Sequence, residues 1–146
     1  MPIEYHRNDK RRLTIVTVTG PCSIDDILSV IDRQASEDTW DYALLYDLRA
    51  AAIDASAHTG LQQIADRVEV LNAGRQRGVV GIAIRPQPAL FLVALTYTTL
   101  TKGFLIVEVL LSEAQIHAWL VRNAAGGSPD QPALTSGPPG ATYEKE

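Results

Sequence analysis

Hydrophobic and polar positions follow two periods along the first 123 residues. Short runs of apolar and β-branched residues, which are typical of strands, occur at Ile3 to Arg7, Leu13 to Thr19, Tyr42 to Asp47, Val79 to Ile84 and Leu105 to Leu110. Apolar residues at helical spacing lie between the later runs and after the last one. The pattern therefore predicts the element order β-β-α-β-α-β-α-β-α.

Capping residues indicate where three of the four predicted helices begin. Ser23 is a candidate N-cap for the first helix. The sequences Thr59-x-x-Gln62 and Ser112-x-x-Gln115 both fit a capping box, in which the two side chains satisfy backbone groups reciprocally. We therefore expect the second and the fourth helix to start at these two sites.

Strands that are separated by helices need crossover connections, and these are right-handed in nearly all proteins. We therefore expect an α/β domain over residues 1–123, with a single mixed, mostly parallel sheet, helices packed against it and an antiparallel hairpin at the start. Residues 124–146 are rich in Ala, Gly, Ser and Pro and have no apolar period. This composition predicts a flexible tail.

Polar residues cluster where the strand at Tyr42 to Asp47 leads into the second helix. The strand is expected to stop at Asp47, and an Ala-rich loop then precedes a helix N-terminus, which favours phosphate or carboxylate groups. Because the carboxyl ends of parallel strands meet at one edge, Arg49, Arg85 and the loop after Leu110 should gather beside Asp47. The candidate binding residues are Asp47, Arg49, Asp54, His58 and Arg85, and the candidate phospho-acceptors are Ser56 and Thr59.

The segment Ala89 to Thr101, which follows Pro88, predicts a third helix, although its β-branched residues would also suit a strand. Its large apolar residues are spread around the helix axis, so they cannot all face one sheet. Part of this surface would be covered by the core, the tail, a second copy of the chain or an apolar ligand. The residues proposed for a dimer or apolar-ligand surface are Leu90, Phe91, Val93 and Tyr97.

Composition and charge exclude some classes of partner and of cellular location. The net charge is −4, which argues against nucleic acid as a partner, and Lys10, Arg11 and Arg12 sit at a predicted hairpin turn. No segment is apolar enough for a signal peptide or for membrane insertion. The chain has one cysteine, Cys22, and so cannot form an internal disulfide. These features predict a soluble cytoplasmic protein.

The sequence gives little support to catalysis or to a bound cofactor. Ser56 lacks the G-x-S-x-G motif that exposes a nucleophile in hydrolases, so a reaction using Asp47, Ser56 and His58 is a minor alternative. The histidines His6, His58 and His117 lie far apart in the sequence and match no metal motif. We therefore expect no metal, no cofactor and no enzymatic activity.

The chain resembles the STAS-like family in its order of elements and in the acidic residue that ends its third strand. Two sequences carry the same resemblance, the opening MPIEYHRNDKRRLTIVTVTGPCSIDDILSVIDRQA and the later SEAQIHAWL. The resemblance is to the branch similar to the sporulation anti-sigma-factor antagonist, and it covers residues 1–123. It implies a mixed sheet with helices mainly on one side and binding of a partner protein or a small ligand. It also implies phosphorylation at the start of the second helix, directly after the acidic residue; here Leu48 follows Asp47.

Two functional hypotheses follow from these observations. The first is a regulatory or binding domain that recognises a protein partner or a small anion at the junction between the third strand and the second helix, with possible dimerisation through the third helix. The second is a carrier or sensor of an apolar, lipid-like small molecule that uses the third helix as a pocket wall.

Overall fold

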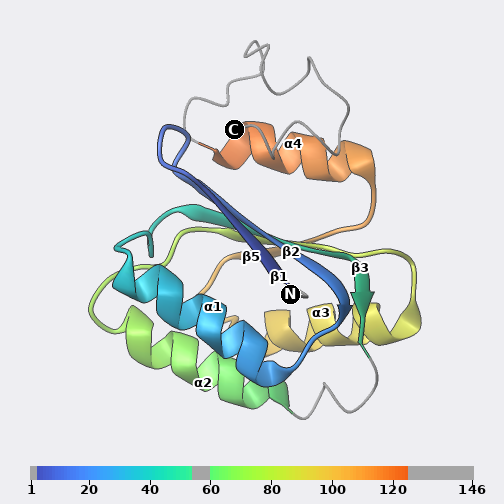
Figure 1. Ribbon diagram of the computed structural model, residues 1–146, viewed down its shortest axis with the longest axis horizontal. Coiled ribbons are helices and arrows are strands. Elements are labelled where there is room, and N and C mark those ends of the chain that lie inside the picture. The colour runs from blue at the N-terminus through green and yellow to red at the C-terminus, as the bar shows by residue number, and fades with distance from the viewer. Residues whose placement is uncertain (1–2, 54–59, 125–146) are drawn as a thin grey trace.

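The computed structural model describes residues 3–53 and 60–124, and over these ranges one mixed five-stranded sheet is covered by four helices (Figure 1). The elements are β1 (Ile3–Asn8), β2 (Leu13–Pro21), α1 (Ile24–Ser36), β3 (Ala43–Ala52), α2 (Leu61–Asn72), β4 (Val80–Ala83), α3 (Pro88–Leu100), β5 (Val107–Leu110) and α4 (Glu113–Asn123). This result confirms the predicted α/β class and the order of elements along the chain. The third helix is a helix and not a strand, with Pro88 in its first turn. The predicted tail, apart from residue 124, lies outside the described residues.

The strands lie in the sheet in the same order as in the sequence, β1-β2-β3-β4-β5. The β1–β2 pair is antiparallel and the other three pairs are parallel, as predicted. Figure 1 shows α1, α2 and α3 on one face of the sheet and α4 on the other. Because each crossover moves the chain one strand along in the same direction, right-handed connections place all three crossover helices on one face.

The two faces of the sheet carry two separate apolar cores. Leu44 and Tyr46 of β3 belong to the larger core, beneath α1, α2 and α3. Ala43 and Leu45, which alternate with them, belong to the smaller core beneath α4. A strand whose successive side chains are buried on opposite faces reads as a continuous apolar run, which is the pattern the sequence shows.

Close packing on the α4 side depends on a glycine in β4. A Cβ atom added at Gly81 would lie 2.8 Å from Cε2 of Trp119, which is almost completely buried. Trp119 can therefore lie flat against the sheet only because this position has no side chain.

The third strand is longer than predicted. It does not stop at Asp47 but continues to Ala52, since β2 also continues and pairs along it. The pairs in this extension are Thr19 with Ala50, Gly20 with Ala51 and Pro21 with Ala52. The register shifts between Thr17 and Thr19, so β3 has one more residue than β2 at this point, which is the geometry of a β-bulge.

The second helix begins differently from the prediction. Its N-cap is Gly60, which makes no side-chain cap, and the Gln62 side chain donates a hydrogen bond to Asp66. Thr59 lies outside the described residues. A Cβ atom on Gly60 would lie 2.3 Å from Cγ1 of Ile24, so the start of α2 is in close contact with the start of α1.

The first and the fourth helix have side-chain caps. Ser23 Oγ accepts from the backbone N–H of Asp26, and the Asp26 carboxylate accepts from the backbone N–H of Ser23, which completes a capping box. Ser112 Oγ accepts from the backbone N–H of Gln115 as predicted. The reciprocal bond is displaced by one residue, because Gln115 Oε1 accepts from the backbone N–H of Leu111.

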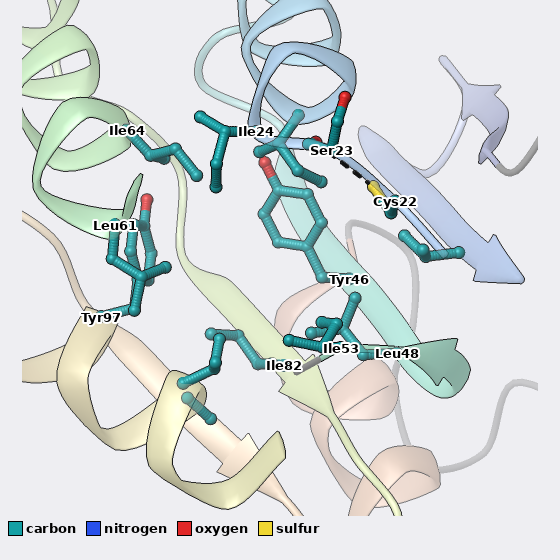
Figure 2. Close-up of a pocket in the computed structure, with 14 residues that line it drawn as sticks. Cys22, Ser23, Ile24, Tyr46, Leu48, Ile53, Leu61, Ile64, Ile82 and Tyr97 are labelled. Carbon is teal, nitrogen blue, oxygen red and sulfur yellow. Dashed lines mark hydrogen bonds between the residues drawn. The ribbon is translucent and has the colours of Figure 1, made fainter. Parts of the chain in front are cut away.

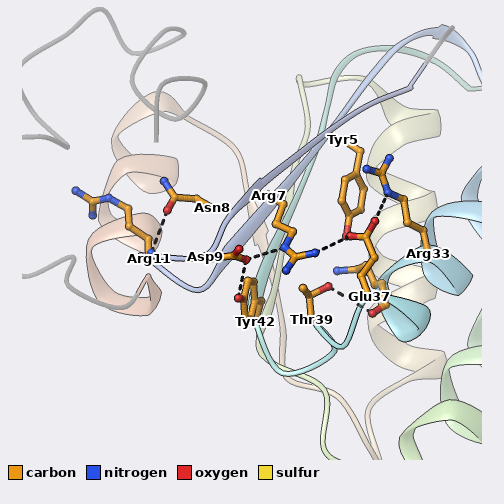
Figure 3. Close-up of polar contacts among 10 residues, drawn as sticks. Tyr5, Arg7, Asn8, Asp9, Arg11, Arg33, Glu37, Thr39 and Tyr42 are labelled. Carbon is orange, nitrogen blue, oxygen red and sulfur yellow. Dashed lines mark hydrogen bonds and ion pairs between the residues drawn. The ribbon is translucent and has the colours of Figure 1, made fainter.

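A polar network fixes the hairpin of β1 and β2 to the end of α1 (Figure 3). Arg7 forms ion pairs with Asp9 and Glu37, Arg33 also pairs with Glu37, and the Tyr42 hydroxyl donates to Asp9 at 2.7 Å. These hydrogen bonds lower the pKa of both carboxyls, through Arg7 at Asp9 and through Arg33 at Glu37. The network connects three elements at one end of the sheet.

Candidate functional site

The charged residues that the sequence places at the carboxyl edge of the sheet do come together. Arg49 holds the Asp47 carboxylate with two side-chain bonds, Nε to Oδ1 at 2.9 Å and Nη2 to Oδ2 at 2.8 Å. Its Nη1 reaches Glu113, at the start of α4, at 2.5 Å. Arg85 Nη1 donates to the carbonyl oxygens of Arg49 and Ala51. Asp47, Arg49 and Arg85 therefore lie together as predicted, and the contact from beyond β5 comes from Glu113, the first residue of α4, and not from the loop itself.

Asp47, however, does not face the second helix. Its neighbours Tyr46 and Leu48 belong to the core beneath α1, α2 and α3, so the alternation of the strand directs Asp47 to the α4 face. Asp47 and the start of α2 therefore lie on opposite faces of the sheet, which corrects the prediction that they form one docking site. The remaining candidates of that loop, Asp54, Ser56, His58 and Thr59, lie outside the described residues.

The Asp47 cluster has the properties of a structural element. Asp47 is almost fully buried, and Arg49 covers it with a two-pronged contact that matches a carboxylate. Arg85 satisfies carbonyl groups of β3 beyond the last residue of β3 that pairs with β4. These contacts hold the extension of β3 and the start of α4 together.

The larger core contains a pocket of about 80 Å³, between the sheet, the starts of α1 and α2, and α3 (Figure 2). Its wall is almost entirely apolar and includes Val18, Leu48, Ile64, Ile82, Val93 and Ala94. A volume of this size accommodates about five to eight groups the size of a water molecule. Val93 and Tyr97, which the sequence assigned to a pocket wall, line it.

The other two residues assigned to that surface have different positions. Leu90 is fully buried in the core and does not line the pocket. Phe91 is 43% exposed and lies on the outer side of α3, next to Leu92 at 50% and Leu95 at 43%. The prediction that the apolar residues of this helix cannot all face one sheet is therefore confirmed.

Two tyrosines from different elements enter the pocket wall. Figure 2 shows the ring of Tyr46, from β3, in the centre of the view with its hydroxyl directed toward Ile24, while Tyr97 projects from α3 toward Leu61. The Tyr46 hydroxyl is buried and makes no hydrogen bond of full geometry with the described residues, although Arg77 is close enough to act on it through a side-chain contact. Burial raises the pKa of Tyr46 and of Tyr97, and the positive charge of Arg77 opposes the shift at both. Both side chains are therefore neutral hydroxyls at neutral pH.

Arg77, between α2 and β4, carries the charge that acts on both tyrosines. It is 3% exposed, its Nη2 donates to Gln34 Oε1 at 2.6 Å, and its guanidinium lies 4.4 Å from the ring centre of Trp40. Its Nε and Nη1 are buried without a hydrogen-bond partner in the part of the chain that the structure describes. The adjacent Gly78 allows this close packing, because a Cβ atom there would lie 2.2 Å from the carbonyl oxygen of Tyr42.

One thiol also lines the pocket. Burial, reinforced by the negative charge of Asp26, raises the pKa of Cys22 to about 11. The reactive form of a cysteine is the thiolate, so Cys22 is a weak nucleophile at neutral pH. The pocket therefore presents almost only hydrophobic surface and no reactive thiolate.

The pocket residues Tyr46 and Cys22, and the nearby buried Arg77, were not predicted from the sequence. The alternation of β3 could have identified Tyr46, since a residue next to a polar position on one face points to the other face. Arg77 has no comparable signal, because its burial depends on contacts with α1 and with the segment before β3.

No family model, no curated protein and no solved structure matches this chain. Within residues 3–53 and 60–124, no group of three His, Cys, Asp or Glu side chains is arranged to hold a metal ion. None of the helices described here is long and apolar enough to cross a membrane. The functional assignment therefore depends on the geometry of the pocket and of the surface.

Proposed function

We propose that this protein is a non-enzymatic binding domain that holds a small apolar molecule between the sheet and the helices α1, α2 and α3. The observation that carries the proposal is the apolar pocket of about 80 Å³ that contacts all four of these elements. Ligand sites are typically concave and mostly apolar, with a small number of polar groups that orient the ligand. Tyr46 and Tyr97, which line the pocket, each carry one hydroxyl group.

The chemistry of the pocket supports binding rather than catalysis. Its thiol, Cys22, has a raised pKa, and its tyrosines are neutral hydroxyls. Catalytic groups are usually perturbed toward reactivity near neutral pH, and these groups are perturbed away from it. The resemblance to STAS-like domains, which implies binding of a protein or a small ligand, supports the same class of function.

The size of the pocket sets the expected affinity. Burying one CH₂ group contributes about 0.8 kcal/mol, so a chain of about five carbons gains roughly 4 kcal/mol, which corresponds to a dissociation constant in the millimolar range. A probe of this length, 1-hexanol, should shift the amide signals of Leu48, Ile64 and Val93 saturably in a ¹H–¹⁵N correlation spectrum. Resonances on α4 should not move.

A matched pair of variants tests whether the pocket itself binds the probe. Ala94 is fully buried and lines the pocket, so Ala94→Leu would fill it and abolish the shifts. Ala118 lies on the exposed side of α4, and Ala118→Leu makes the same chemical change away from the pocket. Saturable shifts that persist in folded Ala94→Leu, or no shifts in the wild type, would contradict the proposal.

A second candidate function, association with a partner protein or with a second copy of the chain, is supported by the exposed strip of Phe91, Leu92 and Leu95 on α3. Exposed apolar residues grouped on one helix are typical of interaction surfaces. Sedimentation velocity tests the homodimer: the wild type should sediment as a dimer and Leu92→Glu as a monomer. If the wild type is still a monomer when its concentration is raised about 100-fold, the homodimer is contradicted, and association with a different protein is the remaining form of this proposal.

Phospho-regulation at Ser56 or Thr59 stays a prediction, because both residues lie outside the described ranges. Intact-mass analysis of protein isolated from its native host tests it directly. A phosphate adduct that disappears in a variant with Ala at both positions would support it, and an unmodified mass under varied growth conditions would contradict it.

A further inference from the structure

Arg77 is a buried cation, and no acidic side chain pairs with it in the described part of the chain. Its side chain makes one hydrogen bond, to the neutral amide oxygen of Gln34, and lies over the ring of Trp40. Two of its nitrogen atoms, Nε and Nη1, are buried without an acceptor. Removing a charge from water is costly unless an opposite charge and hydrogen bonds replace the lost hydration. This arrangement is suited to an anion that is supplied from outside the chain.

Tyr46 connects this charge with the pocket. Its side chain lines the pocket, and its buried hydroxyl makes no hydrogen bond of full geometry with the described residues but lies close enough to Arg77 for the guanidinium to act on it through a side-chain contact and its charge. The same charge acts on Tyr97, which also lines the pocket. Arg77 does not itself line the pocket, so its charge acts on the pocket through the two tyrosines of the wall.

From this juxtaposition we infer that the ligand is a small carboxylic acid, with its hydrocarbon part in the apolar pocket and its carboxylate beside Tyr46 and Arg77. The inference rests on the proposed function of the pocket. A carboxylate accepts hydrogen bonds from both an O–H and an N–H donor, and it carries the single negative charge that balances one guanidinium. A phosphate would bring close to two charges into the same apolar surroundings. An alcohol would satisfy Tyr46 and leave Arg77 without a counter-charge.

Binding of the carboxylate involves a local rearrangement of the wall. The Tyr46 hydroxyl is closed to water and directed toward Ile24, whose side chain is only partly buried at the start of α1 (Figure 2). Ile24 lines the pocket, so a carboxylate that reaches the Tyr46 hydroxyl would have to displace its side chain. The amide signals of the first turn of α1 should therefore shift with a carboxylate probe.

Two probes of equal chain length test the inference, hexanoate and 1-hexanol, titrated at pH 7 and followed by amide shifts. The wild type should bind hexanoate at least about tenfold more tightly, which is the effect of a hydrogen bond to a charged group. Tyr46→Phe should reduce this preference to within about threefold, and so should Arg77→Gln. Tyr42→Phe, which removes a hydroxyl outside the pocket, should leave the preference unchanged.

The outcomes separate the two proposals. If 1-hexanol binds at the pocket and hexanoate binds equally or more weakly, the carboxylate inference is wrong and the apolar pocket remains. An unchanged preference in Tyr46→Phe also overturns the inference, and this variant keeps the test valid if Arg77→Gln does not fold. If neither probe binds, the proposed function and the inference both fail.

Discussion

Replacing Tyr46 by Phe should stabilise the protein, although it changes a buried side chain of the central strand. The ring stays in place and only the hydroxyl is removed, and this hydroxyl is buried and makes no hydrogen bond of full geometry with the described residues. An unpaired buried polar group costs about 1–3 kcal/mol. The favourable effect of Arg77 on the hydroxyl offsets part of this cost, so we expect a net gain of about 0.5–2 kcal/mol in the free energy of unfolding.

Tyr42→Phe is the matched control, because the Tyr42 hydroxyl donates to Asp9 at 2.7 Å. This variant should be less stable than the wild type. Urea unfolding followed by the fluorescence of Trp40 and Trp119 measures both variants, with the slope m checked for constancy. Loss of more than about 1 kcal/mol in Tyr46→Phe at an unchanged slope would show that the hydroxyl is satisfied, and would refute the reasoning on the pocket.

Three further predictions concern other parts of the molecule. Gly81→Ala should lower the free energy of unfolding by about 1–3 kcal/mol, because its Cβ would lie 2.8 Å from the indole ring of Trp119 on α4. Gly74→Ala is the control, because a Cβ there would lie in open space and should have only a small effect when both variants are compared by thermal unfolding. The pKa of Glu37 is lowered in the folded state by Arg33, so its contribution to stability is present above the ordinary value of 4.5 and is lost as the pH falls below it. Glu37→Gln should make this loss of stability smaller in urea unfolding measured at several pH values. An unchanged dependence of stability on pH would contradict the role given to Glu37. Cys22, with a pKa of about 11, should react with iodoacetamide at pH 8 at least about tenfold more slowly than free cysteine, and bound 1-hexanol should slow this reaction further. A rate equal to that of free cysteine would contradict the burial of the thiol.

Strand and helix positions were predictable because each apolar run or helical stripe is a local property of the sequence. The end of β3 was not, since the strand continues past Asp47 only because β2 lies beside it and pairs with it as far as Ala52. The same strand explains why Asp47 does not face the start of α2. Tyr46 occupies the face that α2 covers, and because consecutive residues of a strand point to opposite faces, Asp47 points to the α4 face.

The pocket itself could not be read from the sequence, because it depends on how closely four elements approach one another. The apolar surplus of α3 was visible, but its division was not: Val93 and Tyr97 line the pocket, Leu90 fills the core and Phe91 is exposed. The burial of Arg77 is similarly non-local, because its partners lie in α1 and just before β3. The candidate site is therefore a property of the tertiary structure more than of any motif.

Among the described elements, α4 is the helix that covers the second face of the sheet, and this has a consequence for synthesis in the cell. Leu13, Ile15 and Leu45 are made early, yet the residues that cover them, Trp119 among them, follow some 70 residues or more behind the last of these strand positions. A ribosome adds about 5–20 residues per second, so this apolar surface has no native cover for several seconds. During that interval the nascent chain is a natural substrate for chaperones, and a transcript cut short before α4 should yield an aggregating product.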